Sequence, residues 1–297
     1  MKNIKIGSSN YSSVAMGCMR LQQAKDPQAV IEAAYQSGIT FFDHADIYGG
    51  GQCERIFGEA LQSSYIKRED IFIQSKCSIV SGQRYDMSKE HILKSVDEIL
   101  ERLNTNYLDS LLLHRPDPLM DPCEVADAID ELFKAGKIRY FGVSNMGIYQ
   151  IELLQKYLKQ PITFNQLQYS IMHTNIIDSG ININMPNNNG DGLYEYCRLN
   201  NIIIQAWSPF QYGFFEGTFI DNSKFPKLND LLATLADKYQ TTKTGIATAW
   251  ILRTPNLQMI SGSMNITRIN DIVKASEICL TRQDWYDIYK AAGNQLP

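Results

Sequence analysis

Strand-like and helix-like segments alternate along this whole chain, and no other property of the sequence limits its possible folds as strongly. Short apolar, β-branched runs are each followed by a longer segment whose apolar residues have helical spacing. Eight such runs occupy residues 13–17, 40–45, 70–76, 107–115, 138–145, 164–170, 201–209 and 257–263. Continuously apolar stretches such as SLLLH in the fourth run are typical of strands buried on both faces. The alternation therefore predicts a parallel α/β protein.

The segments between these runs carry helix signals of their own. Asp26 is placed to cap a helix that begins with Pro27 and that Gly38 closes. Apolar residues three or four positions apart predict two further helices, over 92–103 and 125–133, the second followed by Gly136. Strands and helices are thus both expected from local signals.

Two architectures fit eight strands that alternate with helices: a closed barrel and an open doubly wound sheet. An open sheet is expected to place a glycine-rich nucleotide-binding turn after its first strand. Here the first run leads into MGCMRLQQ, which lacks the G-x-G-x-x-G spacing. A (β/α)8 TIM barrel of about 250 residues with terminal additions suits a chain of 297 residues. We therefore expect one domain over 1–297, with an asparagine-rich, mobile loop inserted at 178–192.

Composition excludes several other classes of protein. Lys and Arg number 28 against 32 Asp and Glu, and a net charge of −4 argues against nucleic-acid or anionic-membrane partners. No apolar run approaches the length of a membrane span, and no secretory signal is visible. The six cysteines form no C-x-x-C pair, so we expect reduced thiols in the cytoplasm. The sequence says nothing about the oligomeric state.

Polar residues lie within or at the end of successive strand runs. They are Asp43, Lys76, His114, Ser144, Gln166, Trp207 and Ser261. Asp43 and Lys76 are 33 residues apart, and Lys76 and His114 are 38 apart, which is about one βα unit each time. In a closed parallel barrel the carboxyl ends of the strands meet at one rim, where active sites of this fold lie. One charged residue there can simply meet solvent, but three ionisable groups at consecutive strand ends would perturb one another's pKa.

Tyr48, five residues after Asp43, suggests what this cluster does. A phenol has a pKa near 10, so alone it is a poor proton donor at neutral pH. A lysine ammonium about 4 Å away would attract the phenolate by about 4 kcal/mol at an effective dielectric near 20. Asp43 would keep Lys76 charged and in place, Lys76 would lower the pKa of Tyr48, and Tyr48 would act as a general acid. His114 would orient a carbonyl and donate to a developing oxyanion.

This constellation resembles the aldo-keto reductases, in particular their bacterial general-oxidoreductase branch. Their signature around the tyrosine is present here as DHADIYG over 43–49, with His44 where many members have threonine. Lys76 and His114 match the remaining members of the family's Asp-Tyr-Lys-His tetrad. GKIRYFGVSN over 136–145 and the pair Asn165-Gln166 look like the motifs of the fifth and sixth strands. The resemblance extends from about Val14 to the C-terminus.

The resemblance also implies a nicotinamide cofactor. Ser144, Asn145 and Gln166 would hold the carboxamide, and Trp207, in a Trp-Ser-Pro segment that matches the family's Tyr-Ser-Pro, would stack on the nicotinamide ring. Ser263 and Arg268 match the serine and arginine that hold the 2′-phosphate, so NADP(H) is favoured over NAD(H). The full set of expected cofactor contacts is Gly17, Met19, Ser144, Asn145, Gln166, Trp207, Ser208, Pro209, Gly262, Ser263 and Arg268. Two departures bear on this preference: Gly262 replaces a lysine of the family and Ile272 replaces an asparagine.

Other residues near these positions are expected to have structural roles rather than catalytic or cofactor-binding ones. Cys18 and Cys77 are expected to be small buried thiols. We expect His44 to be a neighbour on the rim and Asp46 to be a loop residue with local backbone hydrogen bonds. The aromatic residues around 212–219 fit ordinary packing and a flap over the cofactor equally well.

The leading hypothesis is an NAD(P)H-dependent oxidoreductase that reduces an aldehyde or ketone to an alcohol, with a small carbonyl compound as its partner. An alternative is an NADP(H)-binding redox sensor or regulatory protein with little turnover. A metal-dependent barrel hydrolase is disfavoured, because the four histidines include no H-x-H or H-x-x-x-H pair, and no metal ligand is expected. The identity of the substrate and the direction of the reaction are not encoded in any motif that we recognise.

Overall fold

A computed structural model describes residues 1–182 and 191–296 and contains a closed barrel of eight parallel strands. Around the barrel the strand order is β10-β11-β12-β3-β4-β5-β8-β9. Their bounds are β3 Val14–Gly17, β4 Phe41–Asp43, β5 Phe72–Cys77, β8 Leu108–Leu113, β9 Ile138–Ser144, β10 Ile162–Gln168, β11 Ile203–Trp207 and β12 Leu257–Ser261. Each of the eight runs overlaps one of these strands, so the prediction of a single-domain (β/α)8 barrel is confirmed.

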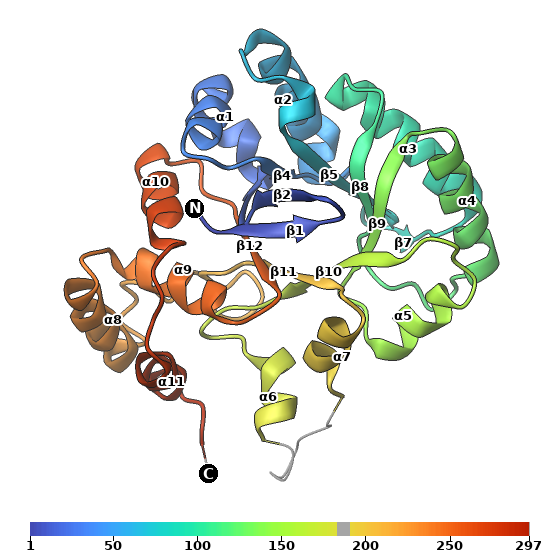
Figure 1. Ribbon diagram of the computed structural model, residues 1–297. Coiled ribbons are helices and arrows are strands. Elements are labelled where there is room, and N and C mark those ends of the chain that lie inside the picture. The colour runs from blue at the N-terminus through green and yellow to red at the C-terminus, as the bar shows by residue number, and fades with distance from the viewer. Residues whose placement is uncertain (183–190, 297) are drawn as a thin grey trace.

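Helices surround the barrel on its outside (Figure 1). They are α1 Pro27–Gln36, α2 Gln52–Ser63, α3 Lys89–Leu103, α4 Pro122–Lys134, α5 Ile148–Gln155, α6 Asn175–Ile181, α7 Leu193–Leu199, α8 Pro226–Lys238, α9 Lys243–Arg253, α10 Ile266–Ala275 and α11 Arg282–Ala291. Asp26 caps α1 as expected, its side chain accepting from the Ala29 amide at 3.0 Å. Within the described ranges, every helix is too short or too polar to cross a membrane.

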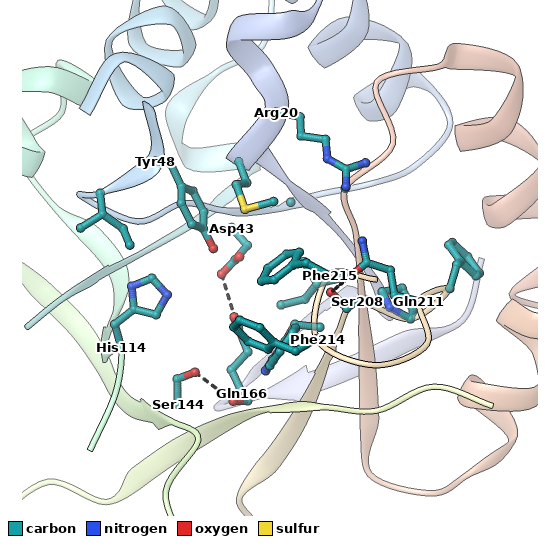
Figure 2. Close-up of a pocket in the computed structure, with 18 of the residues that line it drawn as sticks. Arg20, Asp43, Tyr48, His114, Ser144, Gln166, Ser208, Gln211, Phe214 and Phe215 are labelled. Carbon is teal, nitrogen blue, oxygen red and sulfur yellow. Dashed lines mark hydrogen bonds between the residues drawn. The ribbon is translucent and has the colours of Figure 1, made fainter. Parts of the chain in front are cut away.

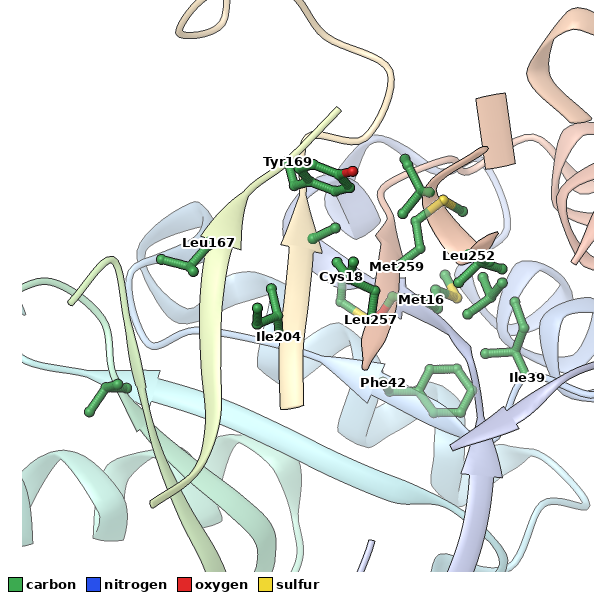
Figure 3. Packing of buried hydrophobic residues seen from close by; sticks show 14 of the residues in the cluster. Met16, Cys18, Ile39, Phe42, Leu167, Tyr169, Ile204, Leu252, Leu257 and Met259 are labelled. Carbon is green, nitrogen blue, oxygen red and sulfur yellow. The ribbon is translucent and has the colours of Figure 1, made fainter. Parts of the chain in front are cut away.

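Each barrel strand divides its side chains between two apolar layers. On β4, Phe42 faces the helices while its neighbour Phe41 packs in the barrel interior. Met259 and Ile260 divide in the same way on β12. Figure 3 shows part of the outer layer, where Met16, Phe42 and Met259 pack between strands and helices. Because side chains alternate along a strand, a strand that is continuously apolar fills both layers.

A β-hairpin that the sequence did not reveal closes the amino end of the barrel. It consists of β1 Asn3–Ile6 and β2 Ser9–Ser12, and in Figure 1 it crosses the centre of the ring of strands. Ile6 packs in the interior cluster, and Tyr11 meets the ring of Phe72, the first residue of β5, at a centroid distance of 4.9 Å. Since this end is sealed, a ligand can enter only at the opposite rim.

Between the apolar base and the rim lies a layer of buried polar side chains. Gln74 donates to Asp43 Oδ1 at 2.6 Å and to Gln205 Oε1 at 2.8 Å. Gln205 donates in turn to Gln258 Oε1 at 2.8 Å, and Gln258 donates to the Ser12 carbonyl at 2.9 Å. These bonds satisfy side chains that would be costly to bury unpaired. We call Gln74, Gln205, Gln258 and Ser110, which donates to Gln74, the glutamine layer.

The first residues of the segment 178–192, which was expected to be a loop, are helical. Residues 178–181 form the end of α6, and Asp178 accepts a hydrogen bond of 2.6 Å from the Tyr289 hydroxyl on α11. Ile177, which is buried, and Ile181, which packs against the core, are four residues apart, and this helical spacing carries the helix into the asparagine-rich stretch. The expected mobility concerns residues 183–190, which lie outside the described residues. A second unpredicted hairpin, β6 Ile79–Val80 with β7 Arg84–Tyr85, follows β5.

Candidate active site

The carboxyl ends of the strands surround a cavity of about 500 Å³. All eleven expected cofactor contacts line it, together with Asp43, Tyr48 and His114. Lys76 lies just beneath and is fully buried. Figure 2 shows Tyr48 and His114 directed into the same space, with Asp43 below Tyr48. Closure of the barrel thus brings together residues that are far apart in sequence, as the strand-end pattern predicts.

Asp43, Lys76 and Tyr48 form a continuous hydrogen-bonded chain. Lys76 Nζ donates to Asp43 Oδ2 at 2.8 Å and to the Tyr48 hydroxyl at 3.2 Å. Its third bond, of 2.7 Å, goes to the carbonyl oxygen of His44. Asp43 Oδ1 accepts two further bonds, from the Gln74 and Gln166 amides. Every ammonium proton and both carboxylate oxygens are therefore engaged, which fixes the position of the lysine beneath the phenol.

Opposing effects act on the two ionisable groups at the end of this chain. Burial lowers the pKa of Lys76, but the Asp43 carboxylate and the Tyr48 phenol raise it by more, so the lysine remains charged. Burial raises the pKa of Tyr48, and the Lys76 charge offsets only part of this increase. Lys76 lowers the pKa of Tyr48, as expected, but burial raises it by more, so the net shift of this pKa is upward. Tyr48 thus carries its proton at neutral pH and is a proton donor in this state.

The turn after Tyr48 holds the phenol at the rim. Residues Tyr48–Gly51 form a short 3₁₀ turn in which Gly49 has φ 59° and Gly51 has φ 87°. The positive φ of Gly49 favours glycine there, whereas the nearest atom to an added Cβ, Gln22 Oε1 at 2.3 Å, belongs to an exposed side chain that can move away. The turn leads into α2, where the buried Glu54 accepts from Ser75 Oγ at 2.6 Å and from Arg102 Nε at 2.7 Å. Glu54 thereby ties the tyrosine turn to β5, which carries Lys76.

His114 lies across the cavity from the tyrosine. The two rings are 6.0 Å apart between centroids and nearly perpendicular, at 82°. Burial, followed by the positive charges of Lys76 and Arg115, holds the pKa of His114 well below its usual range, so the imidazole is neutral. Its Nδ1 is buried without a partner among residues 1–182 and 191–296. Nε2 is thus the nitrogen left for a ligand in the cavity.

A group of amide and hydroxyl side chains lies between β9, β10 and β11. Asn145 Nδ2 donates to Ser144 Oγ at 2.7 Å, and Trp207 Nε1 donates to Asn145 Oδ1 at 3.1 Å. Gln166 uses its amide protons on Asp43 and on Gln205, which leaves its own carbonyl oxygen as an acceptor for a ligand. Asn145 and Ser208 both have positive φ, at 58° and 51°. Such strained conformations are concentrated at functional sites.

The opposite part of the cavity suits a phosphate-bearing ligand. Gly262 leaves open space where a side chain would lie, and Ser263 also lines the cavity, whereas Ser261, which the strand-end pattern placed at the rim, is buried and does not line it. Arg268 lies exposed in the first turn of α10, which Asn265 caps. Free amide groups and an arginine at a helix start favour anions. These residues fit the phosphate end of a nicotinamide dinucleotide.

Of two residues next to the tetrad, His44 differs from expectation, whereas Asp46 has the expected local hydrogen bond with the Ile47 backbone. His44 is fully buried against the Phe57 ring rather than exposed on the rim, and neither ring nitrogen has a partner within the described ranges. Burial, with the Lys76 charge, lowers its pKa to about 3. Asp46 is partly buried, and its Oδ1 also has no partner among the described residues. Burial and the nearby Glu54 raise the pKa of Asp46 to about 7. Cys18 and Cys77 are buried thiols, as predicted.

The aromatic segment after β11 divides into packing and cavity residues. Phe219 is fully buried, and Tyr212 packs against Phe225. Phe214 and Phe215 line the cavity and are 62% and 50% exposed. The ring of Phe215 is stacked against Trp207 at 6.2 Å. Packing therefore accounts for part of this segment, and the rest is available as a wall or flap.

Several residues that line the cavity were not predicted. They are Arg20, Ile47, Ile79, Arg115, Phe210, Gln211, Thr218 and Ile260. Arg20 and Arg115 each follow within three residues of a strand end, which is the signal that identifies the other site residues. In the described part of the chain, no cluster of His, Cys, Asp and Glu side chains has the geometry of a metal site.

Comparisons with known proteins identify the family of this chain. Residues 6–292 match the model of the Aldo/keto reductase family. Oxidoreductase YdhF of Escherichia coli (strain K12) is 37% identical, with 97% of this chain and 96% of that protein aligned. A 6-dehydroglucose reductase of Agrobacterium fabrum is 33% identical over 89% of this chain and 87% of its own. The crystal structure of a thermostable aldo-keto reductase, Tm1743, has a TM-score of 0.81 at 26% identity and covers 98% of this chain and 100% of its own.

Proposed function

Since this chain belongs to the aldo/keto reductase family, we propose that it is an NADP(H)-dependent oxidoreductase that reduces an aldehyde or ketone to an alcohol. The observation that carries the proposal is the chain from Asp43 through Lys76 to the Tyr48 hydroxyl, which ends in the cavity opposite a neutral His114. This arrangement presents a proton donor and a hydrogen-bond donor to one oxygen atom of a ligand. A relative that is named a reductase supports the same direction of reaction.

In this proposal the four residues have separate tasks. The carbonyl oxygen lies between Tyr48 and His114, and His114 Nε2 orients it by a hydrogen bond. Tyr48 transfers its phenolic proton to that oxygen as negative charge develops there. Lys76, charged and 3.2 Å from the hydroxyl, stabilises the phenolate that remains. Asp43 keeps the lysine charged and in position. The reverse reaction uses the same groups in the opposite order.

The remaining residues of the cavity fit the cofactor. A bound nicotinamide dinucleotide supplies the hydride for the carbonyl carbon. Trp207 offers a flat aromatic surface for the nicotinamide ring, and Gln166 offers the acceptor oxygen for its carboxamide. Ser263 and Arg268, with a guanidinium suited to a phosphate, favour NADP(H) over NAD(H). Gly17, Met19, Ser208 and Pro209 line the space between these two ends.

The decisive experiment is the loss of NADPH absorbance with an activated aromatic aldehyde, for the wild type and for Tyr48→Phe. Removing the proton donor should lower kcat by about 10²- to 10⁴-fold. NADPH affinity should stay close to wild type, because the hydroxyl is directed at the substrate. Tyr149→Phe on α5, whose side chain is 88% exposed, is a matched control that should retain full turnover.

Three outcomes are informative. Near wild-type turnover by Tyr48→Phe with intact NADPH binding would reject the mechanism. NADPH binding without reduction of any of a varied set of carbonyl compounds would favour the sensor hypothesis instead. A kcat/KM for NADH equal to that for NADPH would show that Arg268 does not select the phosphate.

A further inference from the structure

Arg115 lines the cavity directly after His114 and has no counter-ion within the described residues. No carboxylate of residues 1–182 and 191–296 lies within 4.0 Å of its guanidinium, and it makes no hydrogen bond there. Two aromatic rings lie near it: the centroids of Trp207 and Phe214 are each 5.9 Å from Cζ. The side chain is partly buried. A guanidinium in this setting keeps all five of its N–H donors for a ligand.

The charges on the cavity wall are strongly unequal. Arg20, Arg115 and Arg268 line it, whereas the acidic group on the wall, Asp43, is already paired with Lys76. The cavity therefore favours anionic ligands. The phosphates of the proposed cofactor would pair with some of these arginines. The position of each arginine therefore decides whether it meets the cofactor or the substrate.

Barrel topology separates Arg115 from the phosphate end. Arg268 follows β12 and Arg20 follows the neighbouring strand β3. Arg115 follows β8, which is four strands away from β12 in either direction around the closed barrel and so lies diametrically opposite. Arg115 is on the side of His114, where the carbonyl of a substrate is expected.

The walls around Arg115 are apolar. Phe214 and Trp207 lie beside the guanidinium, and the cavity is also lined by Ile47 and Ile79, which follow β4 and β5 on the same side of the barrel as β8. Such walls suit an aromatic or branched carbon skeleton, and the arginine fork suits a planar anion at its far end. A ligand that satisfies both has a carbonyl at one end and a carboxylate at the other.

We propose that Arg115 determines substrate specificity by binding a carboxylate, so that the preferred substrates are aldehydes or ketones that also carry an anionic group on an apolar body. This inference rests on the proposed reductase function and names its substrate class. Arg115 would position the substrate through two parallel N–H···O bonds while His114 and Tyr48 hold the carbonyl oxygen. The proton transfer itself would not involve Arg115.

The test compares 4-carboxybenzaldehyde with 4-nitrobenzaldehyde, which has nearly the same shape and no net charge. Each is assayed with the wild type, Arg115→Met and Arg115→Lys at saturating NADPH. Methionine retains an unbranched apolar stem against the aromatic rings but removes the charge, and lysine retains the charge. The intrinsic reactivities of the two aldehydes cancel, because only the change in their kcat/KM ratio between variants is compared.

We expect Arg115→Met to lower the ratio of carboxylate to nitro kcat/KM by about 10- to 100-fold, mainly through KM, as the loss of a charge-assisted bond implies. Arg115→Lys should recover much of that ratio. An equal fall for both aldehydes would overturn the proposal and would mean that Arg115 only packs on the rings. A raised KM for NADPH with an unchanged ratio would also overturn it, and would assign Arg115 to a cofactor phosphate.

Binding separates this inference from the proposed function. Both aldehydes are titrated by calorimetry into the NADP⁺ complex, in which no hydride is available. If the wild type reduces neither aldehyde but binds the carboxylate more tightly, and Arg115→Met removes this preference, the anion site stands and the reductase proposal fails. Equal affinities of the wild type for the two aldehydes would overturn the anion site whatever the turnover.

Discussion

The burial of two polar side chains beside the Asp43–Lys76 pair lowers the stability of the fold. His44 is neutral and sealed behind Phe57, while its backbone carbonyl holds Lys76. Asp46 lies close to Glu54, and burial with that second carboxylate raises its pKa to about 7. Unpaired polar groups destabilise a fold, and natural proteins tolerate them mainly at functional sites. The tyrosine turn is such a place, because the chain must leave β4 and present Tyr48 within five residues.

Asp46 should make stability depend on pH. Its folded pKa lies above the unfolded value near 4, so the folded state loses stability as pH rises from about 4 through about 7. Asp46→Asn removes this penalty, and at pH 8 it should stabilise the protein by about 1–2 kcal/mol after allowance for partial exposure. Urea unfolding at pH 5 and pH 8 measures the difference, which should be larger at pH 8.

Asp127→Asn provides the control for this experiment, because Asp127 is an exposed residue of α4. It should change stability equally at both pH values. If Asp46→Asn destabilises the protein more at pH 8 than at pH 5, the carboxylate of Asp46 is stabilising and the assignment of its pKa is wrong.

At the scale of elements, α9 and α11 are joined by two indole rings. Trp250 and Trp285 stack with centroids 4.8 Å apart, and each Nε1 donates to the backbone carbonyl of the other residue, at 3.0 and 3.1 Å. Trp250 is fully buried and also stacks on Tyr169, beyond the end of β10. The pair thus connects the last helix to the barrel wall.

Trp250→Ala should lower the free energy of unfolding by about 3–5 kcal/mol, since it removes a large buried ring and leaves a cavity. Trp250→Phe, which retains much of the packing but loses the indole N–H, should cost clearly less. Urea denaturation followed by circular dichroism measures both. A loss below about 1 kcal/mol for the alanine variant would show that α11 contributes little to the stability of the barrel.

At the scale of the whole molecule, the glutamine layer crosses the barrel. Gln205 on β11 is bonded to Gln74 on β5, to Gln166 on β10 and to Gln258 on β12. One side chain thereby links strands that are up to 131 residues apart in sequence. The layer separates the apolar base from the polar rim and supports Asp43 from below.

Gln205→Leu should therefore be costly although leucine is apolar and of similar size. It removes one hydrogen-bond partner from each of three buried glutamines, whose remaining bonds go to Asp43, Ser110 and the Ser12 carbonyl, and we expect a loss of about 2–4 kcal/mol in urea unfolding. Gln62→Leu, on the exposed face of α2, should change stability by less than about 0.5 kcal/mol. Equal effects of the two substitutions would contradict the structural importance of the layer.

The order of strands and helices was predictable because each barrel strand is buried on both faces and reads as a continuous apolar run. Asp43, Lys76 and His114 were predictable as neighbours for a related reason: an ionisable residue that ends such a run stands out, and closure brings such ends to one rim. Tyr48 lies in the loop after Asp43 and was identified by its place in that loop. The β1–β2 hairpin escaped notice, since its strands alternate weakly and are only four residues each.

The amino-acid sequence alone determined the barrel, because strand periodicity is a local property, and it predicted the residues of the cofactor side only through the resemblance to the aldo-keto reductases. Only the tertiary structure decided how far the residues of the site are buried, which partners they bond to and how their pKa values shift. Burial of Tyr48, the sealing of His44 and the glutamine bonds under Asp43 depend on neighbours from distant strands. The same holds for Arg115, because a free guanidinium is recognised only when every carboxylate that could pair with it has been placed.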